Sequence, residues 1–410
     1  MNILRFTTAG SVDDGKSTLI GRLLYDSKSV YIDQMEAVEK TSQRKGLEQV
    51  DFSLLTDGLK DEREQGITID VAYRYFATPT RKFIIADTPG HVQYTRNMVT
   101  GASTANAALI LIDARNGVVE QTRRHSFIAG LLGIEAVIVC VNKMDLVDYS
   151  QEAFDKVVAD FDMVRERCGL KRVDFIPVSA LLGDNVVESG DNMPWYEGPT
   201  LLGHLESLEV EVTDGDFRMP VQTVVRPHSV EHHDFRGYAG RIASGVVAVG
   251  DTLDLCPMGA QSKVTSVRIG DQEVESAHIG QSVCITLEDD IDVSRGDVLS
   301  KGSQPQAMRS GTATLCWMDN APQRPGAKYV MRQGTAEGQA MLSQVDAVLD
   351  IEELNYESPE GPLTKNQIAR ITWKCAKDLA VDSYANNRMT GSFILVDANS
   401  GATVAAGMMD

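Results

Sequence analysis

Near its start the chain carries the stretch Gly10-Ser11-Val12-Asp13-Asp14-Gly15-Lys16-Ser17, from which its fold can be inferred. It fits the pattern G-x-x-x-x-G-K-[ST], in which glycines let successive backbone N–H groups face one concavity that holds phosphate oxygens. Lys16 supplies a charge for the β- and γ-phosphates, and the Ser17 hydroxyl is suited to Mg²⁺. An apolar run, Leu4–Ala9, precedes the stretch and a helical pattern follows it, which is the required strand–loop–helix context. We therefore expect a nucleotide site that includes every residue from Gly10 to Thr18.

A second motif, Asp87-Thr88-Pro89-Gly90, follows the apolar strand candidate 83–86. An aspartate at such a strand end can hold a Mg²⁺-bound water, and the Gly90 N–H can meet the γ-phosphate. Alone the motif is weak, because a strand followed by Asp and a turn is also an ordinary way to enter a helix. Behind the first motif it indicates the metal side of the same site, with Asp87 as a metal-site residue.

A third motif, Asn142-Lys143-Met144-Asp145, follows the apolar run 136–141 and predicts the base. The carboxylate of Asp145 can accept two hydrogen bonds from the N1–H and 2-amino group of guanine, donors that adenine lacks. Ser179-Ala180-Leu181, after the strand candidate 175–178, is the expected last part of the base site. Together these residues predict selection of GTP over ATP.

The charged segment Arg63-Glu64-Gln65-Gly66-Ile67-Thr68 lies between the first two motifs. Its charged flank has two interpretations, a solvated face or a loop that orders around the γ-phosphate and Mg²⁺. In order with the other motifs it fits the loop, with Thr68 as a second hydroxyl ligand of Mg²⁺.

Alternating strand and helix patterns fill the chain to about residue 210 and indicate a mostly parallel sheet with helices on both faces. The further strand candidates are Thr68–Phe76, Lys82–Ala86, Ala107–Ile112, Ala136–Val141 and Phe175–Val178. The helix candidates are Ser17–Tyr25, Val92–Gly101, Gln121–Leu132, Gln151–Arg167 and Pro199–Leu208. After residue 212, short strands separated by turns suggest two small β-barrels, with closing strands at 390–396 and 402–407. We expect domains at 1–212, 213–302 and 303–410.

Composition narrows the class of protein. The 410 residues carry a net charge of −19, which weakens the case for binding nucleic acid, since that needs clustered Lys and Arg. No apolar run approaches the ~20 residues needed to span a bilayer, and the start of the chain has no signal-peptide pattern. The six cysteines are scattered and form no C-x-x-C pair, so neither zinc nor a disulfide framework is indicated. A cytoplasmic protein is the expectation.

Asp87-Thr88-Pro89-Gly90-His91, the segment 63–68 and the segment Phe235–Ile242 resemble the elongation-factor group of GTPases. The resemblance covers almost the whole chain and implies a GTP-binding domain followed by two β-barrels. It implies that His91 orients the attacking water, with Val12 and Ile67 as an apolar gate beside it. It also implies that Asp13 can bind a monovalent cation, Na⁺ or K⁺, near the phosphates.

Within that group, several segments are similar to the large subunits of bacterial heterodimeric sulfate adenylyltransferase. They are Leu54–Leu59, Glu62–Tyr75, Thr122–Ala129, Met193–Pro199 and Asn387–Leu395. Elongation factor Tu, in contrast, has histidines where Ser11 and Asp14 stand. The resemblance implies that GTP hydrolysis here drives the joining of sulfate to AMP from ATP, giving adenylylsulfate and pyrophosphate. A smaller catalytic subunit would bind ATP and sulfate in a heterodimer or higher assembly, with neither nucleic acid nor membrane as partner.

Two other functions stay open on the sequence alone. One is a translational GTPase that carries aminoacyl-tRNA, and the other is a regulatory GTPase whose only partners are proteins. The segments just named favour the sulfate adenylyltransferase subunit. A fused adenylylsulfate kinase would need a second G-x-x-x-x-G-K-[ST] stretch, and the 410 residues hold none.

Overall fold

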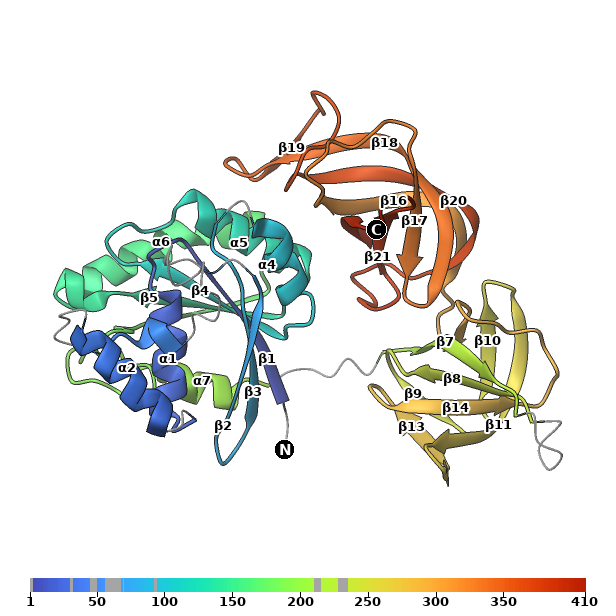
Figure 1. The fold of residues 1–410 in the computed structure, drawn as a ribbon, viewed down its shortest axis with the longest axis horizontal. Coiled ribbons are helices and arrows are strands. Elements are labelled where there is room, and N and C mark those ends of the chain that lie inside the picture. Colours follow the sequence, from blue (N-terminus) through green and yellow to red (C-terminus); the bar gives the residue numbers. More distant parts are fainter. Residues whose placement is uncertain are drawn as a thin grey trace. The chain divides into compact units, whose positions relative to one another are not determined.

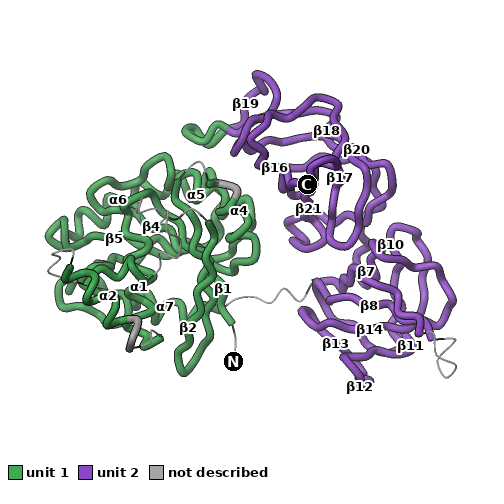
Figure 2. Tube along the Cα trace, viewed as in Figure 1, with its two compact units in different colours: residues 1–210, 350–355 green, residues 211–349, 356–410 purple. Residues whose placement is uncertain are grey.

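The computed structural model of the chain describes residues 3–29, 32–44, 50–55, 68, 70–91, 94–209, 215–227 and 235–410. The chain divides into two compact units, residues 1–210 with 350–355 and residues 211–349 with 356–410 (Figure 2). Within the described ranges, every helix is too short or too polar to cross a bilayer.

The first unit is built on one six-stranded sheet. Its strands are β1 (Ile3–Gly10), β2 (Ala72–Ala77), β3 (Lys82–Asp87), β4 (Ala107–Asp113), β5 (Ala136–Asn142) and β6 (Arg172–Pro177). They lie in the order β2-β3-β1-β4-β5-β6 (Figure 1). Only β2 runs antiparallel to its neighbour, so the sheet is mostly parallel as predicted. Every residue of β4 and β5 is buried, as expected for central strands covered on both faces.

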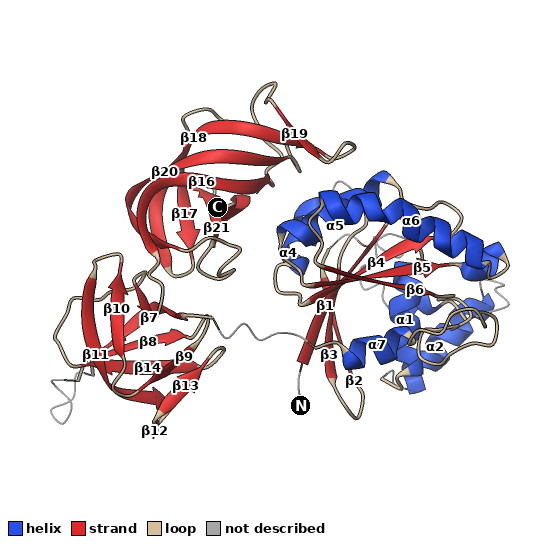
Figure 3. Cartoon of the chain, turned by 180° about the vertical axis from the view of Figure 1, so that it is seen from behind, coloured by secondary structure: helices blue, strands red, loops and turns tan. Residues whose placement is uncertain are grey.

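Helices cover both faces of this sheet (Figure 3). They are α1 (Lys16–Asp26), α2 (Ile32–Arg44), α4 (Thr95–Ala102), α5 (Glu120–Leu131), α6 (Gln151–Arg167) and α7 (Leu201–Ser207), with the 3-10 turns η1 (Phe52–Leu55) and η3 (Met144–Val147). On one face, Leu19 of α1 and Leu205 of α7 pack with Phe6 of β1 in one apolar core. On the other face, α4 contacts β1 and β3, α5 contacts β4, and α6 contacts β6.

Two elements of the first unit differ from the sequence-based expectation. Strand β2 begins at Ala72 rather than at Thr68, because its partner β3 ends at Asp87, which pairs with Ala72. The helix α2 was not predicted. Among the side chains described on it, only Val38 is a buried apolar one, so few apolar residues mark this helix in the sequence.

The second unit begins with a closed β-barrel. Its strands are β7 (Phe217–Val225), β8 (Gly237–Arg241), β10 (Thr252–Cys256), β11 (Ala260–Ile269), β14 (Ser282–Leu287) and β15 (Val298–Lys301). They follow the order β10-β15-β7-β8-β14-β11, and β10 also pairs with β11, which closes the ring. The short strand β12 (Gln272–Val274) extends β11, while β9 (Val246–Ala248) and β13 (Ser276–His278) form a separate ribbon.

A second closed barrel follows. Its strands are β16 (Gln306–Trp317), β17 (Lys328–Gln333), β18 (Ala336–Asp350), β20 (Ile368–Val381), β21 (Ser392–Asp397) and β22 (Thr403–Met409). The order is β17-β21-β22-β16-β20-β18, with β17 also paired to β18 and the short β19 (Asn355–Glu357) at the edge. The predicted fold class, an α/β domain followed by two small β-barrels, is confirmed. The bounds at 212 and 302 stay predictions.

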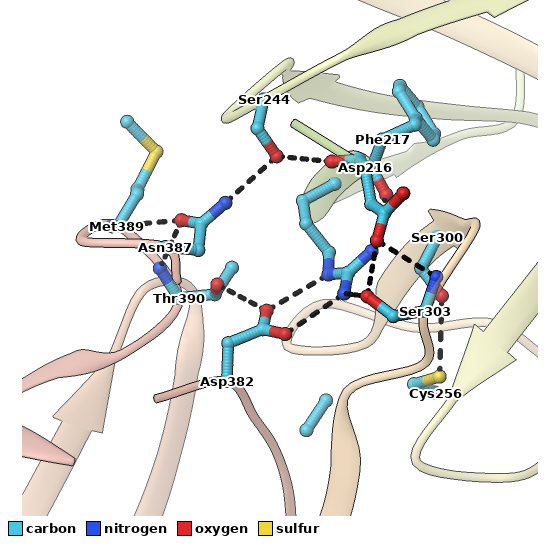
Figure 4. Close-up of polar contacts among 12 residues, drawn as sticks. Asp216, Phe217, Ser244, Cys256, Ser300, Ser303, Asp382, Asn387, Met389 and Thr390 are labelled. Atoms are coloured by element: carbon cyan, nitrogen blue, oxygen red, sulfur yellow. Dashed lines mark hydrogen bonds and ion pairs between the residues drawn. The ribbon is translucent and has the colours of Figure 1, made fainter. Parts of the chain in front are cut away.

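A buried ion pair joins the two barrels within the second unit (Figure 4). Arg218 of β7 donates two hydrogen bonds to Asp382, just after β20, at 2.9 and 3.0 Å, and both residues are buried. The Thr390 hydroxyl donates to the same carboxylate at 2.6 Å, and Asn387 donates to Ser244 at 2.8 Å. Leaving one of these buried charges without its partner would cost free energy, so the ion pair stabilises the contact between the two barrels.

Candidate nucleotide site

A cavity of about 460 Å³ lies in the first unit, beside the ends of β1, β3 and β5. Loops beyond the carboxyl ends of parallel strands are where open α/β sheets bind ligands. The lining residues are Ser11, Val12, Asp13, Gly15, Lys16, Ser17, Thr18, Ser53, Thr68, Gly90, His91, Asn142, Lys143, Asp145, Leu146, Ala180 and Leu181. The structure thus brings together residues from all the predicted motifs. Of the predicted site residues, Gly10, Asp14, Asp87 and Ser179 do not line the cavity, and Ile67 lies outside the described residues.

The loop between β1 and α1 curls around the cavity. Asp13 and Gly15 both have a left-handed backbone, with φ of 71° and 88°. The carboxylate of Asp14 turns inward and accepts a hydrogen bond from the Ser11 N–H at 2.6 Å, which explains why Asp14 is absent from the cavity wall. Burial, with Asp113 nearby, raises the pKa of Asp14 to about 6. A Cβ at Gly15 would lie 2.5 Å from Nδ2 of Asn142, so a side chain there would push this amide away.

Lys16 connects the first loop to two other predicted site residues. Its ammonium lies 2.7 Å from Oδ1 of Asp87 and donates to the Thr68 hydroxyl at 2.9 Å. It also donates to the backbone carbonyl of Thr88. Lys16 and Asp87 are both buried, so their charges interact with little screening by water.

The residues predicted to hold Mg²⁺ fit a hard cation. The Thr68 hydroxyl and the Asp87 carboxylate converge on one cationic atom, Nζ of Lys16. The Ser17 hydroxyl belongs to the same cavity wall. All three offer oxygen, the donor that Mg²⁺ prefers, and none offers sulfur or imidazole nitrogen.

The turn after β3 approaches the first loop very closely. A Cβ at Gly90 would lie 2.2 Å from the carbonyl oxygen of Gly10, so only glycine fits without a shift. The next residue, His91, lies on the cavity wall with Val12, whose side chain is partly exposed. The His91 ring also contacts Tyr94, at 6.1 Å between ring centroids.

The loops after β5 and β6 meet at the other end of the cavity. Asn142 is buried and links two loops, donating to the carbonyl of Asp14 at 2.7 Å and accepting from the Ala180 N–H at 2.9 Å. The Ser179 hydroxyl donates to Oδ1 of Asp145 at 2.6 Å, which orients that carboxylate. Ser179 therefore acts on the cavity through Asp145 rather than by lining it.

Three residues of the site had not been predicted. Ser53 and Leu146 line the cavity, and Arg22 donates to the carbonyls of Leu181 and Leu182 at 3.3 and 3.1 Å. None of them belongs to a short motif. Their roles depend on contacts between segments distant in sequence, which no local pattern reveals.

Comparisons with known proteins place this site in a family. The family model of the elongation factor Tu GTP-binding domain matches residues 1–219, and that of the GTP-eEF1A C-terminal domain-like family matches residues 310–410. Sulfate adenylyltransferase subunit 1 of Bacteroides thetaiotaomicron is 50% identical over 421 residues, covering 100% of this chain and 86% of that protein. The chain belongs to the sulfate adenylyltransferase subunit 1 family.

Other relatives agree with this assignment. Sulfate adenylyltransferase subunit 1 of Vibrio campbellii is 50% identical over 416 residues, covering 100% of this chain and 86% of its own length. The protein named "Bifunctional enzyme CysN/CysC" of Mycobacterium tuberculosis H37Rv is 50% identical over 411 residues, covering 99% of this chain and 67% of its own. The sulfate adenylyltransferase subunit 1 family therefore includes relatives that extend beyond the region shared with this chain.

Proposed function

We propose that this chain binds GTP with Mg²⁺ and hydrolyses it, and that hydrolysis drives the formation of adenylylsulfate and pyrophosphate from ATP and sulfate. The observation that carries the proposal is one cavity lined by both Lys16, the proposed phosphate ligand, and Asp145, the proposed guanine ligand, in a chain half identical over its full length to subunit 1 of sulfate adenylyltransferase. We propose residues 1–212 as the GTP-binding domain, with the barrels at 213–302 and 303–410.

The phosphate end works by positioning charge. On nucleotide binding, the Lys16 ammonium exchanges the oxygens of Asp87 and Thr68 for oxygens of the β- and γ-phosphates. This exchange releases the oxygens of Asp87 and Thr68, which together with the Ser17 hydroxyl would hold Mg²⁺. When bound, the metal ion neutralises charge that develops on the phosphates. The Gly90 N–H then meets the γ-phosphate.

Hydrolysis requires a water aligned with the γ-phosphate. We propose that His91, which lies on the cavity wall, orients that water, and that Val12 of the same wall forms one side of an apolar gate. Ile67, the other proposed side of the gate, is outside the described residues. An imidazole that positions a water in this way contributes by orientation and proton acceptance.

The partner in this proposal is a smaller catalytic subunit that binds ATP and sulfate. A heterodimer, alone or within a higher assembly, would couple the two reactions if the partner binds the GTP and GDP states with different affinities. We also propose a cytoplasmic location, since all six cysteines are free thiols, as in a reducing compartment.

A monovalent cation forms a further part of the proposal. Asp13 lines the cavity together with Gly15, Lys16 and Ser17 of the same loop, which supports a role of its carboxylate near the proposed phosphates. We expect Na⁺ or K⁺ to bind there and to raise the hydrolysis rate. Replacing both ions by a bulky tetraalkylammonium tests this, and an unchanged rate contradicts it.

Nucleotide competition tests the GTP site directly. GTP and GDP should displace a fluorescent GDP analogue from the chain, ATP should not, and removal of Mg²⁺ by a chelator should weaken binding. Equal competition by ATP would contradict the base assignment. Stable GTP-dependent binding of aminoacyl-tRNA would instead support a translational GTPase.

A further inference from the structure

Asp113 is a buried carboxylate next to the proposed guanine end of the cavity, and none of the sequence motifs includes it. It ends β4 and pairs in register with Asn142, the last residue of β5. Its side chain is 2% exposed. Its Oδ2 lies 3.0 Å from Nζ of Lys143, which lines the cavity.

A second cation clamps the same carboxylate. Arg115 donates to Asp113 through its backbone N–H and Nε, both at 3.0 Å, and through a third nitrogen at 2.6 Å. Burial opposes ionisation of Asp113, but the hydrogen bonds from Arg115 and Lys143 outweigh it and lower the pKa to about 2. Asp113 is therefore a fixed negative charge at neutral pH.

Lys143 is the residue on which this charge acts within the cavity. Its backbone is left-handed, with φ of 62°, at the point where the chain leaves β5. A lysine side chain that is free to rotate loses conformational entropy when it is ordered against a ligand. The ion pair with Asp113 removes much of this freedom before a ligand arrives, so the apolar stem of Lys143 is already in place as a wall of the cavity.

We propose that Asp113 is a positioning residue for base binding, and that it acts by anchoring the ammonium of Lys143 so that the lysine stem packs against the face of the guanine ring. The proposal rests on the GTP site proposed above. It concerns the base end, where the carboxylate of Asp113 pairs with Lys143, whereas Lys16 contacts Thr68 and Asp87 at the phosphate end.

Two substitutions test the charge of Asp113 and the ammonium of Lys143 separately. Asp113→Asn removes the buried charge and nearly keeps the shape. Lys143→Met keeps an unbranched apolar stem and removes the ammonium. We expect each to weaken GDP binding about tenfold, and the double variant to be no weaker than Lys143→Met, because both changes break one interaction.

The matched control is Arg115→Met, which removes the other cation at the same carboxylate. Arg115 is 46% exposed and does not line the cavity. The variant Arg115→Met should change GDP affinity less than about twofold. A merely structural role of Asp113 would make Arg115→Met as harmful as Asp113→Asn.

A ligand without a base gives the decisive readout. Its affinity is measured by competition of inorganic triphosphate with a fluorescent GTP analogue, corrected for the weaker binding of the analogue itself. This affinity should be the same in Asp113→Asn and in the unaltered chain. The proposal that Asp113 anchors Lys143 would be overturned if Lys143→Met bound GDP with the affinity of the unaltered chain. It would also be overturned if the losses of GDP affinity added up in the double variant. If Asp113→Asn does not fold, Lys143→Met and Arg115→Met still decide the question. If the unaltered chain binds no guanine nucleotide, the proposed function fails instead.

Discussion

At the scale of single residues, we propose that the carboxylate of Asp145 selects the base that the cavity accepts. Asp145 receives a hydrogen bond from Ser179 on Oδ1, which leaves the carboxylate oriented to accept from guanine. Asp145→Asn replaces one acceptor by a donor, which suits the 2-oxo group of xanthine. We expect GTP affinity to fall roughly a hundredfold or more, since two hydrogen bonds to a charged group are disturbed, and XTP affinity to rise.

Competition binding with GTP and XTP measures this exchange. Asp148→Asn is a suitable control, because it makes the same chemical change three residues further along at an exposed position away from the cavity wall. Unchanged GTP preference in Asp145→Asn would remove this residue from the base site.

His91 is the second decisive residue. His91→Ala should slow GTP hydrolysis by roughly a hundredfold or more, the usual contribution of a positioned acid or base, while GTP affinity changes little. Single-turnover hydrolysis and equilibrium binding measure the two effects separately. His278→Ala, at an exposed position in β13 of the second unit, is the control. A fall in binding as large as the fall in rate would show that His91 does not act on the water.

At the scale of elements, the turn after β3 approaches the start of the β1–α1 loop so closely that one added methyl group should disturb it. Gly90→Ala would place a Cβ against the Gly10 carbonyl, so the turn after β3 must move. We expect a loss of about 1–3 kcal/mol of stability from overpacking. We also expect GTP binding to weaken more than GDP binding, because the proposed contact of the Gly90 N–H is with the γ-phosphate, which GDP lacks.

Thermal unfolding and nucleotide binding check the Gly90 prediction. Gly361→Ala is the control, since a Cβ there meets no atom within 4 Å and its backbone is not left-handed. If Gly90→Ala bound GTP and GDP with unchanged affinity, the γ-phosphate contact would be wrong.

The sequence predicted elements where the local pattern determines structure. The apolar runs 107–112 and 136–141 predicted the strands β4 and β5. The motifs predicted that Lys16, Thr68 and Asp145 lie around one site, and they line one cavity. The start of β2 was wrong because strand pairing depends on where β3 ends. The position of Asp113 beside Lys143 could not be predicted, because it arises from the pairing of β4 with β5.

At the scale of the whole molecule, the Arg218–Asp382 pair should matter far more than an exposed pair. Arg218→Met leaves Asp382 buried without its cation, so we expect a loss of about 3–5 kcal/mol in the free energy of unfolding of the second unit. Arg309→Met is the control, since Arg309 and Asp378 are 64% and 43% exposed and such pairs contribute at most about 1 kcal/mol. Equal shifts of the two variants in urea unfolding would contradict this role.

The proposed function requires that GTP hydrolysis on this chain is coupled to adenylylsulfate formation on a partner. The most direct test measures both products when the chain is combined with a smaller catalytic sulfate adenylyltransferase subunit, ATP and sulfate, omitting one component at a time. We expect GTP hydrolysis to rise only when all three are present and to keep a constant ratio to adenylylsulfate formation. Hydrolysis that is indifferent to the partner, ATP and sulfate would contradict it.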